Sequence, residues 1–146
     1  MKLSKVEQFI LRLAMDAPLV CDVFMADYYR DNGLSADAGS TWRFCLCNAE
    51  PDTYTEAITT FNIGNKNSPT LSTVDAAGGG RARQITGFAD GVIAADDDAS
   101  HWAVVDVTNT RLHSSGALTA PQAVTTANPF TIPTSQFAAI GDAEAA

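Results

Sequence analysis

The heptapeptide His101-Trp-Ala-Val-Val-Asp-Val107 carries the strongest secondary-structure signal in the chain. Side chains of an extended strand alternate between its two faces. The heptapeptide therefore places Trp102, Val104 and Asp106 on one face and three small or branched residues on the other. A turn is predicted directly after it, at 108–110, where Thr-Asn-Thr interrupts the apolar pattern. The pattern predicts a β-strand and, with it, a β-rich fold.

Similar short alternations, rich in Thr, Val, Ile and Gly, continue from this strand in both directions. Upstream, Trp42, Phe44 and Leu46 predict a half-buried strand, and residues 53–62 predict one or two helical turns. Many short strands at this spacing indicate a mainly β protein, an antiparallel β-sandwich or barrel rather than a parallel α/β sheet. Further strands are predicted over 81–88, 92–94, 111–115, 122–126 and 130–132, with loops at 64–69 and 78–80 and a hairpin turn at Asp90-Gly91.

A chain of 146 residues is long enough to bury about two-thirds of its unfolded surface in a single core. The apolar residues that alternate in the predicted strands are the expected members of that core. They are Trp42, Phe44, Leu46, Ile85, Trp102, Val104, Leu118, Val124, Phe130 and Ile132.

The first 38 residues have helical rather than strand-like patterning. Ser4 and Glu7 have the spacing of a capping box, and apolar residues then recur at helical intervals, which predicts a helix over about 5–15. A second helix is predicted from Pro18 to near Asn32-Gly33. We therefore divide the chain into a helical segment at 1–38, a β-sandwich domain at 39–140 and a flexible tail at 141–146.

The apolar and aromatic residues of the helical segment form a candidate interface. A β-sandwich does not require them, and an exposed apolar stripe promotes association. The alternative is that the helices pack on the sandwich of the same molecule and close one end of it, with the tyrosines covering the core. The candidate interface residues are Phe9, Leu13, Leu19, Val23, Phe24, Tyr28 and Tyr29.

The charge balance excludes several classes of partner. Nine basic and seventeen acidic side chains give a net charge of -8, which repels phosphate backbones and anionic lipid. No apolar run approaches the ~20 residues that a membrane helix requires. Charged residues also interrupt the start of the chain, so no signal peptide is expected and the protein is expected to remain in the cytoplasm where it is made. We expect neither a nucleic acid nor a membrane as partner.

Three groups of residues have compositions that could support chemistry, and each is better explained structurally. Cys21, Cys45 and Cys47 lack a second Cys or His pair at metal-ligand spacing, so reduced, half-buried thiols are expected. The Gly78-Gly-Gly-Arg81 run lacks the Gly-Lys-Ser/Thr ending of a phosphate loop. The run Asp96-Asp-Asp98, with Asp90 nearby, lacks the alternating ligand pattern of a calcium loop.

The two histidines lack the surroundings of a catalytic base. Imidazole titrates near neutral pH, so His101 and His113 are candidates for general base catalysis. No nucleophile elbow is present, and Ser100 precedes His101 in a predicted strand, where neighbouring side chains point to opposite faces. The chain is therefore expected to have no catalytic, cofactor-binding or metal-binding residue and not to be an enzyme.

Two parts of the sequence carry motifs in a specific order. The first is Phe44-Cys-Leu-Cys-Asn-Ala-Glu-Pro-Asp-Thr-Tyr-Thr-Glu-Ala57, running on to Ile63-Gly-Asn-Lys66. The second is Ala99-Ser-His-Trp-Ala-Val-Val-Asp106, followed by Gly116-Ala-Leu-Thr-Ala120 and Phe130-Thr-Ile-Pro133. Together these pieces span about residues 41–138, and their order and spacing are more specific than any one motif. They resemble small structural proteins encoded in the virion gene clusters of tailed phages and prophages.

The resemblance implies a head decoration or cement protein with a jelly-roll-like β-sandwich. Such a protein binds the outer surface of the capsid, contacts the major capsid protein, associates with its own copies there, and stabilises the shell by bridging subunits. Residues 1–33 match the pattern less well, and no active site is carried over. Two alternatives stay open: a tail or fibre component that contacts the host, and a small carbohydrate-binding module or hydrolase that would use His101, Asp106 and aromatic residues.

Overall fold

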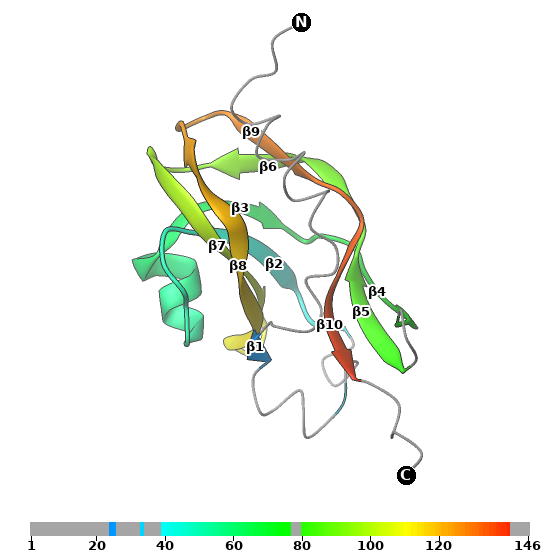
Figure 1. Ribbon diagram of the computed structural model, residues 1–146. Helices are drawn as coiled ribbons and strands as arrows, with labels where there is room; N and C mark the ends of the chain where they lie inside the picture. Colours follow the sequence, from blue (N-terminus) through cyan, green and yellow to red (C-terminus); the bar gives the residue numbers. More distant parts are fainter. Residues whose placement is uncertain (1–23, 26–32, 34–38, 77–79, 141–146) are drawn as a thin grey trace, which may run out of the picture.

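The computed structural model of this chain describes residues 24–25, 33, 39–76 and 80–140. Within these residues the protein is mainly β, and every strand pair is antiparallel. A seven-stranded sheet has the order β1-β8-β7-β2-β3-β6-β9, and a three-stranded sheet has the order β10-β5-β4 (Figure 1). The elements are β1 (Phe24–Met25), β2 (Trp42–Cys47), η1 (Glu56–Thr60), β3 (Asn62–Asn67), β4 (Leu71–Asp75), β5 (Arg81–Ile85), β6 (Phe88–Ile93), β7 (Asp97–Asp106), β8 (Arg111–Val124), β9 (Pro129–Ile132) and β10 (Ser135–Ile140).

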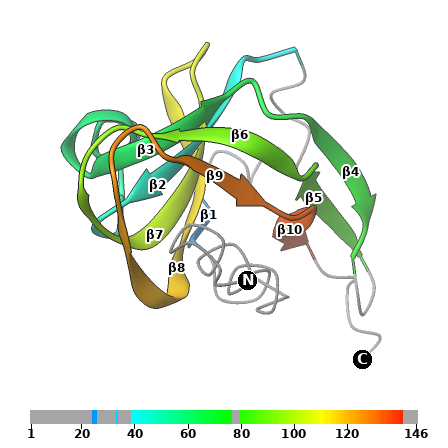
Figure 2. The ribbon, with the colours of Figure 1, turned by 90° about the horizontal axis from the view of Figure 1, so that it is seen from above.

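The smaller sheet continues three strands of the larger one. Short connections at 68–70, 86–87 and 133–134 join β3 to β4, β5 to β6 and β9 to β10. The order β3-β6-β9 in the large sheet therefore matches the order β4-β5-β10 in the small one. Seen from above, the strands bend at these connections and the assembly curls into half of a barrel (Figure 2). Strands that bend at a corner and pass between sheets enclose a core without a crossover helix.

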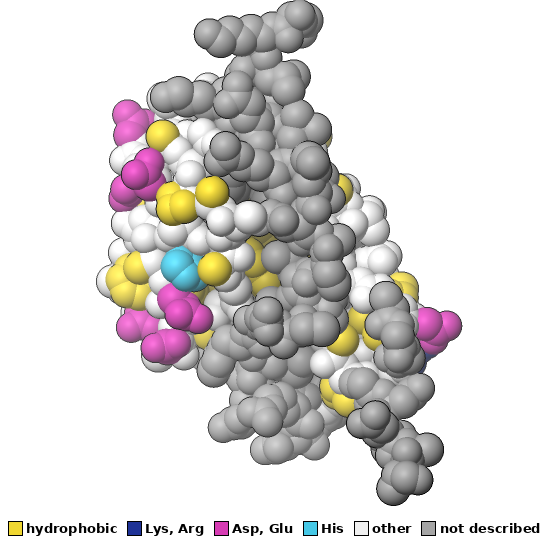
Figure 3. All heavy atoms as spheres, viewed as in Figure 1, with side chains coloured by type: hydrophobic (Ala, Val, Ile, Leu, Met, Phe, Trp, Pro, Cys, Tyr) yellow, Lys and Arg dark blue, Asp and Glu magenta, His cyan; other side chains and the backbone are white. Residues whose placement is uncertain are grey.

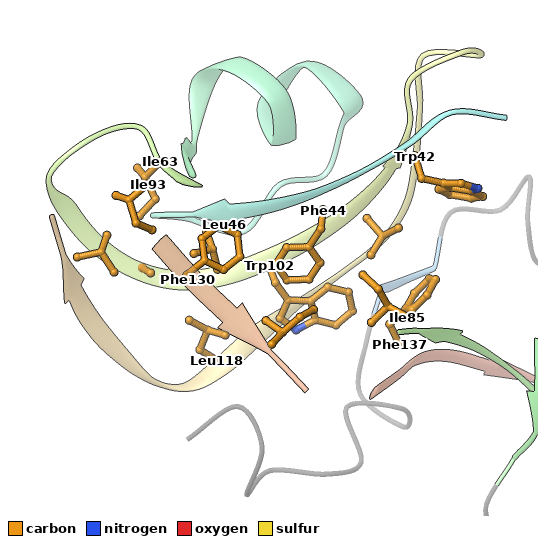
Figure 4. Close-up of a cluster of buried hydrophobic side chains, with 14 of the residues drawn as sticks. Trp42, Phe44, Leu46, Ile63, Ile85, Ile93, Trp102, Leu118, Phe130 and Phe137 are labelled. Atoms are coloured by element: carbon orange, nitrogen blue, oxygen red, sulfur yellow. The ribbon is translucent and has the colours of Figure 1, made fainter. Parts of the chain in front are cut away.

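One apolar core is shared by the two sheets. Leu46, Trp102 and Phe130 of the large sheet and Ile85 and Phe137 of the small sheet belong to a single cluster of buried side chains (Figure 4). All ten residues predicted to form the core are buried in the structure, which confirms that prediction. The alternation of apolar residues in the sequence therefore identified the inward faces of the strands correctly.

The opposite face of the large sheet is covered as well. Cys45 and Cys47 of β2 are fully buried with Ala57 of η1 in a second apolar cluster. Val105 of β7 and Leu112 of β8 belong to the same cluster. The expectation of a half-buried strand at 42–47 with half-buried thiols was therefore wrong, because η1 covers the face that alternation assigned to solvent.

Element η1 confirms the helical turns predicted within 53–62. Thr53 and Glu56 form a capping box: the Glu56 carboxylate accepts hydrogen bonds from the backbone N–H groups of Asp52 and Thr53, and Thr53 Oγ1 accepts one from the Glu56 N–H. The backbone N–H of Phe61 donates to the Glu56 carbonyl, five residues earlier, at 2.9 Å. This wide last turn ends the helix after a single π-type turn.

Two loop predictions were wrong because the sheet uses turn-like residues within strands. Residues 62–67, predicted largely as loop, form β3 between β2 and β6. Asp90-Gly91, predicted as a hairpin turn, lies within β6. Gly91 faces Phe130 across the ladder, and a Cβ atom there would lie 2.4 Å from the phenyl ring. The glycine is therefore required by close packing rather than by a turn.

Strand β8 is continuous from Arg111 to Val124, although two separate strands were predicted over 111–115 and 122–126. Gly116 lies against the Trp102 indole, where a Cβ atom would be 2.8 Å from the ring. Pro121 lies where the ladder between β7 and β8 shifts register, so its missing N–H removes no ladder hydrogen bond. Strands β4 and β10 were not predicted.

The N-terminal predictions fall mostly outside the described residues. The helix predicted at 5–15 and the flexible tail at 141–146 lie outside them. The second predicted helix was wrong at Phe24 and Met25, which form β1 and pair with Ser115 and Ser114 of β8. Among the residues that the structure describes, no helix has the length and apolar character needed to cross a membrane.

Candidate functional site

Of the seven candidate interface residues, the structure describes only Phe24. Its backbone in β1 pairs with Ser115, at the edge of the seven-stranded sheet. The other six, Phe9, Leu13, Leu19, Val23, Tyr28 and Tyr29, lie outside the described residues, and their role in an interface stays a prediction.

The surface of the described region is strongly acidic. Seven of its acidic side chains are exposed, whereas Arg81 is the only exposed basic side chain in the same part of the chain. In the view of Figure 3 the acidic side chains lie mainly along one edge of the molecule. A surface of this sign favours a partner with a basic face and disfavours polyanions.

The aspartate run at 96–98 makes hydrogen bonds within the protein instead of converging on one point. The Asp96 carboxylate accepts a bond from the Thr126 backbone N–H at 2.6 Å, and the Asp97 carboxylate accepts one from the Asn48 side chain at 2.8 Å. These bonds lower the pKa of both carboxyl groups. In the described part of the chain, no group of three or more His, Cys, Asp or Glu side chains is placed to hold a metal ion.

Ser100 and His101 approach each other, contrary to the expectation that they point to opposite faces. Ser100 Oγ and His101 Nδ1 share a hydrogen bond at 2.8 Å. Ala99 pairs with Gln122 and His101 pairs with Ala117, so the ladder shifts register at Ser100. Such irregularities re-aim side chains out of strict alternation. The described hydrogen bonds of this pair include no acid or second base that would orient the imidazole for nucleophilic catalysis.

A second irregularity in β8 carries His113 into the core. Val104 pairs with Ser114 and Val105 pairs with Leu112, so His113 is an extra residue on β8, a β-bulge. The bulge lets both His113 and Ser114 be fully buried, and His113 Nδ1 and Ser114 Oγ share a hydrogen bond at 3.1 Å.

The His113 imidazole lies among groups from both sheets. Its ring makes edge contacts with Trp42 of β2 at 5.5 Å and Phe137 of β10 at 5.3 Å, measured between ring centroids. The Arg83 guanidinium of β5 lies 5.8 Å from the Trp42 ring centroid. Burial, and secondly the positive charge of Arg83, lower the pKa of His113 from 6.5 to about 3, although the Asp106 carboxylate opposes this. The imidazole is therefore neutral at neutral pH.

This cluster was not foreseen from the sequence. Ser114, Ser115, His113 and Asp106 are the buried polar residues of the described region, and three of them are consecutive on β8. A run of His-Ser-Ser has no local feature that predicts burial, because the burial results from the bulge and from the elements that pack on it. Ser115 Oγ donates a hydrogen bond to the Pro51 carbonyl at 3.2 Å, which joins β8 to the loop before η1.

Asp106 has a structural role at the end of β7. Its carboxylate accepts hydrogen bonds from the Asn109 backbone N–H at 3.1 Å and from the Asn109 side-chain amide at 2.7 Å. These bonds hold the 107–110 turn, which confirms the turn predicted at 108–110. The hydrolase alternative named Asp106 together with His101; the printed bonds of Asp106 close the turn that follows β7.

We expect Cys45 and Cys47 to be unreactive in the folded protein. Burial raises the pKa of Cys45 to about 12, and burial together with the neighbouring Cys45 raises the pKa of Cys47 even further, so neither forms the reactive thiolate. N-ethylmaleimide at pH 8, followed by peptide mass mapping, should leave both thiols unlabelled in buffer and label both in concentrated urea. Labelling of either thiol in the native protein at the rate of a free thiol would contradict this burial.

Comparison of the chain with protein-family models, with curated proteins and with solved structures finds no match.

Proposed function

We propose that this chain is a head decoration protein of a tailed phage. It binds the outer surface of the capsid, contacts the major capsid protein and stabilises the shell by bridging subunits. The observation that carries the proposal is spatial: the pieces that resemble phage virion proteins lie in β2, η1, β3, β7, β8 and β9. Four of these strands, β8-β7-β2-β3, are consecutive neighbours in the large sheet. The resemblance therefore covers one folded unit rather than scattered loops.

The physical character of this unit suits a cement function. Packaged DNA presses outward on a capsid, so a molecule that spans a seam between subunits adds contact area that must be lost before they separate; about 1,600 Å² would be ordinary. Such a molecule needs to be rigid, and here both faces of β2 and β7 are packed. Its acidic surface keeps the free protein in solution and away from packaged DNA.

The jelly-roll-like β-sandwich implied by the resemblance is part of this proposal. Its support is that side chains from the large and the small sheet share one core, with Phe130 and Phe137 on strands that continue from one sheet into the other. Two sheets facing a common apolar layer is the arrangement of sandwich folds.

Copy number in purified virions tests the proposal. Quantitative mass spectrometry of the phage that encodes this chain should find it at hundreds of copies per particle, in fixed ratio to the major capsid protein. A tail or fibre component would be present at only a few copies, and absence from purified particles would exclude both functions.

Binding to heads tests the predicted interface directly. Heads assembled without this protein are mixed with the purified full-length chain and sedimented. The double substitution Phe9→Ser and Leu13→Ser should reduce the bound fraction at least tenfold, because it removes two apolar residues from the candidate interface. A matched double substitution at exposed positions, Thr119→Ser and Thr125→Ser, should bind like the unaltered protein. Equal binding of both variants would show that these N-terminal residues are not the attachment site.

The carbohydrate-binding alternative has weaker support. Such modules present exposed aromatic rings to sugars. Both tryptophans are buried here, Trp42 at 7% and Trp102 at 1% exposure. Binding of this protein to glycans on an array would support this alternative.

A further inference from the structure

We propose that the three-stranded sheet is a flap that acid releases. Protonation of His113 lets β4, β5 and β10 swing together away from the seven-stranded sheet, while the larger sheet stays folded. Opening uncovers apolar side chains of the core that the two sheets share. This flap is a property of the chain alone and does not depend on the proposed function.

The three strands of the flap are bound to one another. Strand β5 lies between β4 and β10 and pairs with both (Figure 1). Side chains add further bonds within the flap: Arg83 Nη1 donates to Thr73 Oγ1 at 3.2 Å, and Gln136 Nε2 donates to the Asp75 carbonyl at 3.2 Å. The three strands can therefore move as one body.

The three connections that join the flap to the large sheet lie side by side. The Thr86 backbone N–H donates to the Thr70 carbonyl at 2.9 Å, and the Gly87 N–H donates to Thr134 Oγ1 at 2.9 Å. A Cβ atom at Gly87 would lie 2.9 Å from the Thr134 nitrogen, so the connections are also closely packed. Since each strand of the flap follows or precedes one of these connections, a small rotation along this line turns all three strands together.

His113 lies where the flap meets the large sheet. Its ring contacts Phe137 of the flap and Trp42 of the large sheet, with centroid distances of 5.3 Å and 5.5 Å. The Arg83 guanidinium of the flap lies 5.8 Å from the Trp42 ring centroid. Phe137 and Ile85 extend from the flap into the shared core (Figure 4). These contacts between side chains hold the flap closed while the imidazole is neutral.

The charges around His113 make this contact sensitive to acid. In the described part of the chain, the charged groups that act on the imidazole are Arg83 on the flap and Asp106 of β7, while the rings of Trp42 and Phe137 are uncharged. Protonation would place a buried positive charge opposite that of Arg83, and the attraction of Asp106 is the smallest of the three effects on the pKa of His113. Opening hydrates the imidazolium and separates it from Arg83, so acid favours the open flap.

A cysteine in the shared core reports opening of the flap. Ala138 is fully buried on β10, so Ala138→Cys places a thiol under the closed flap. The full-length variant is treated with 4,4′-dithiodipyridine, which reacts with thiols in acid, and labelling is compared with that of a free thiol at the same pH. The pKa of His113 is about 3 when buried and 6.5 when exposed, so the normalised rate should rise about 25-fold from pH 7 to pH 5.

The native thiols of the large sheet are the matched control. Cys45 and Cys47 are buried in the second cluster, under η1, which opening of the flap leaves intact. Peptide mass mapping should find both labelled more slowly than position 138 by about tenfold or more at each pH. If Ala138→Cys does not fold, Ile85→Cys on β5 is the second reporter, because Ile85 is also buried in the shared core.

Adding His113→Gln to the reporter variant should abolish the rise in labelling between pH 7 and pH 5, and His113→Asn replaces it if that variant does not fold. The flap is disproved if position 138 is labelled no faster than Cys45 and Cys47, because the chain then opens only as a whole. It is also disproved if labelling at position 138 does not rise in acid, or if the rise is equally large without His113.

Discussion

Phe130→Ala is expected to lower the free energy of unfolding by about 3 to 5 kcal/mol, the usual cost of truncating a buried aromatic side chain. Phe130 is fully buried, and its ring centroid lies 6.1 Å from that of Phe44 and 5.6 Å from that of Phe88. Gly91 leaves room for the ring on the neighbouring strand. Truncation therefore removes the contacts of the ring with Phe44, Phe88 and Gly91. It leaves a cavity, because Gly91 has no side chain that could fill the space.

Urea titration followed by tryptophan fluorescence measures this loss, because both tryptophans are buried in the native state. Val92→Ala is the matched control: Val92 lies beside Gly91 in the same strand but is 54% exposed, so its truncation should change the free energy of unfolding by no more than about 0.5 kcal/mol. A loss below about 1 kcal/mol for Phe130→Ala would contradict the assignment of Phe130 to the centre of the core.

The position of Phe130 in the core could be predicted from the sequence because alternation is a local property. A strand that alternates apolar and polar residues exposes one face to a core wherever that strand lies in the sheet. Trp42, Trp102 and Val124 were assigned to the core for the same reason, and all three are buried. Alternation does not show whether another element also packs on the opposite face of a strand. Cys45 and Cys47 are buried only because η1 packs on the other face of β2.

Glycines were misread where tertiary packing, rather than a turn, required them. Asp90-Gly91 and Gly116 have the local composition of turns, yet each glycine lies within a strand against an aromatic ring. The rings, Phe130 and Trp102, are 39 and 14 residues away in the sequence. Gly91 and Phe130 are too far apart for a local window to contain both, and Trp102 and Gly116 lie on different strands, so local composition does not show that either pair is in contact.

The cluster around His113 could not be predicted for a related reason. Trp42, Arg83, His113 and Phe137 come from four strands in two sheets, and a one-residue bulge in β8 brings the imidazole to them. A bulge of this kind shifts every later side chain of the strand to the other face, so its position decides which residues are buried. The sequence Leu112-His113-Ser114 has no feature that locates it.

The burial of His113 is expected to make the protein less stable as the pH falls from 7 to 5, by about 2 kcal/mol. The pKa of His113 is about 3 in the folded protein and about 6.5 in an exposed imidazole. Between these values the unfolded chain binds a proton that the folded protein does not, so the free energy of unfolding decreases by about 1.4 kcal/mol for each pH unit. The stabilisation is complete above pH 6.5 and is lost progressively toward pH 3.

Between pH 7 and pH 5 the effect of His113 on stability can be measured separately from that of the carboxylates. The pKa values of Asp90, Asp96 and Asp97 are lowered from 3.8 by hydrogen bonds, chiefly to Lys66, Thr126 and Asn48 respectively, so these groups remain charged down to pH 5. Protonation of these carboxylates also lowers the free energy of unfolding, but only at lower pH. Urea titrations at pH 7, 6 and 5 therefore report mainly His113.

The variant His113→Gln separates burial of the imidazole from every other source of pH dependence. Glutamine cannot titrate but retains a group able to bond to Ser114, so the variant should have a nearly constant free energy of unfolding between pH 7 and pH 5. It should also be less stable than the unaltered protein at pH 7, because the ring contacts with Trp42 and Phe137 are lost. His101→Gln, which removes the partly exposed imidazole, should keep the pH dependence. The opposite result would be a pH dependence of the free energy of unfolding that persists in His113→Gln and disappears in His101→Gln. In that case His113 is not the histidine kept neutral by burial, and the bulge in β8 does not bury it.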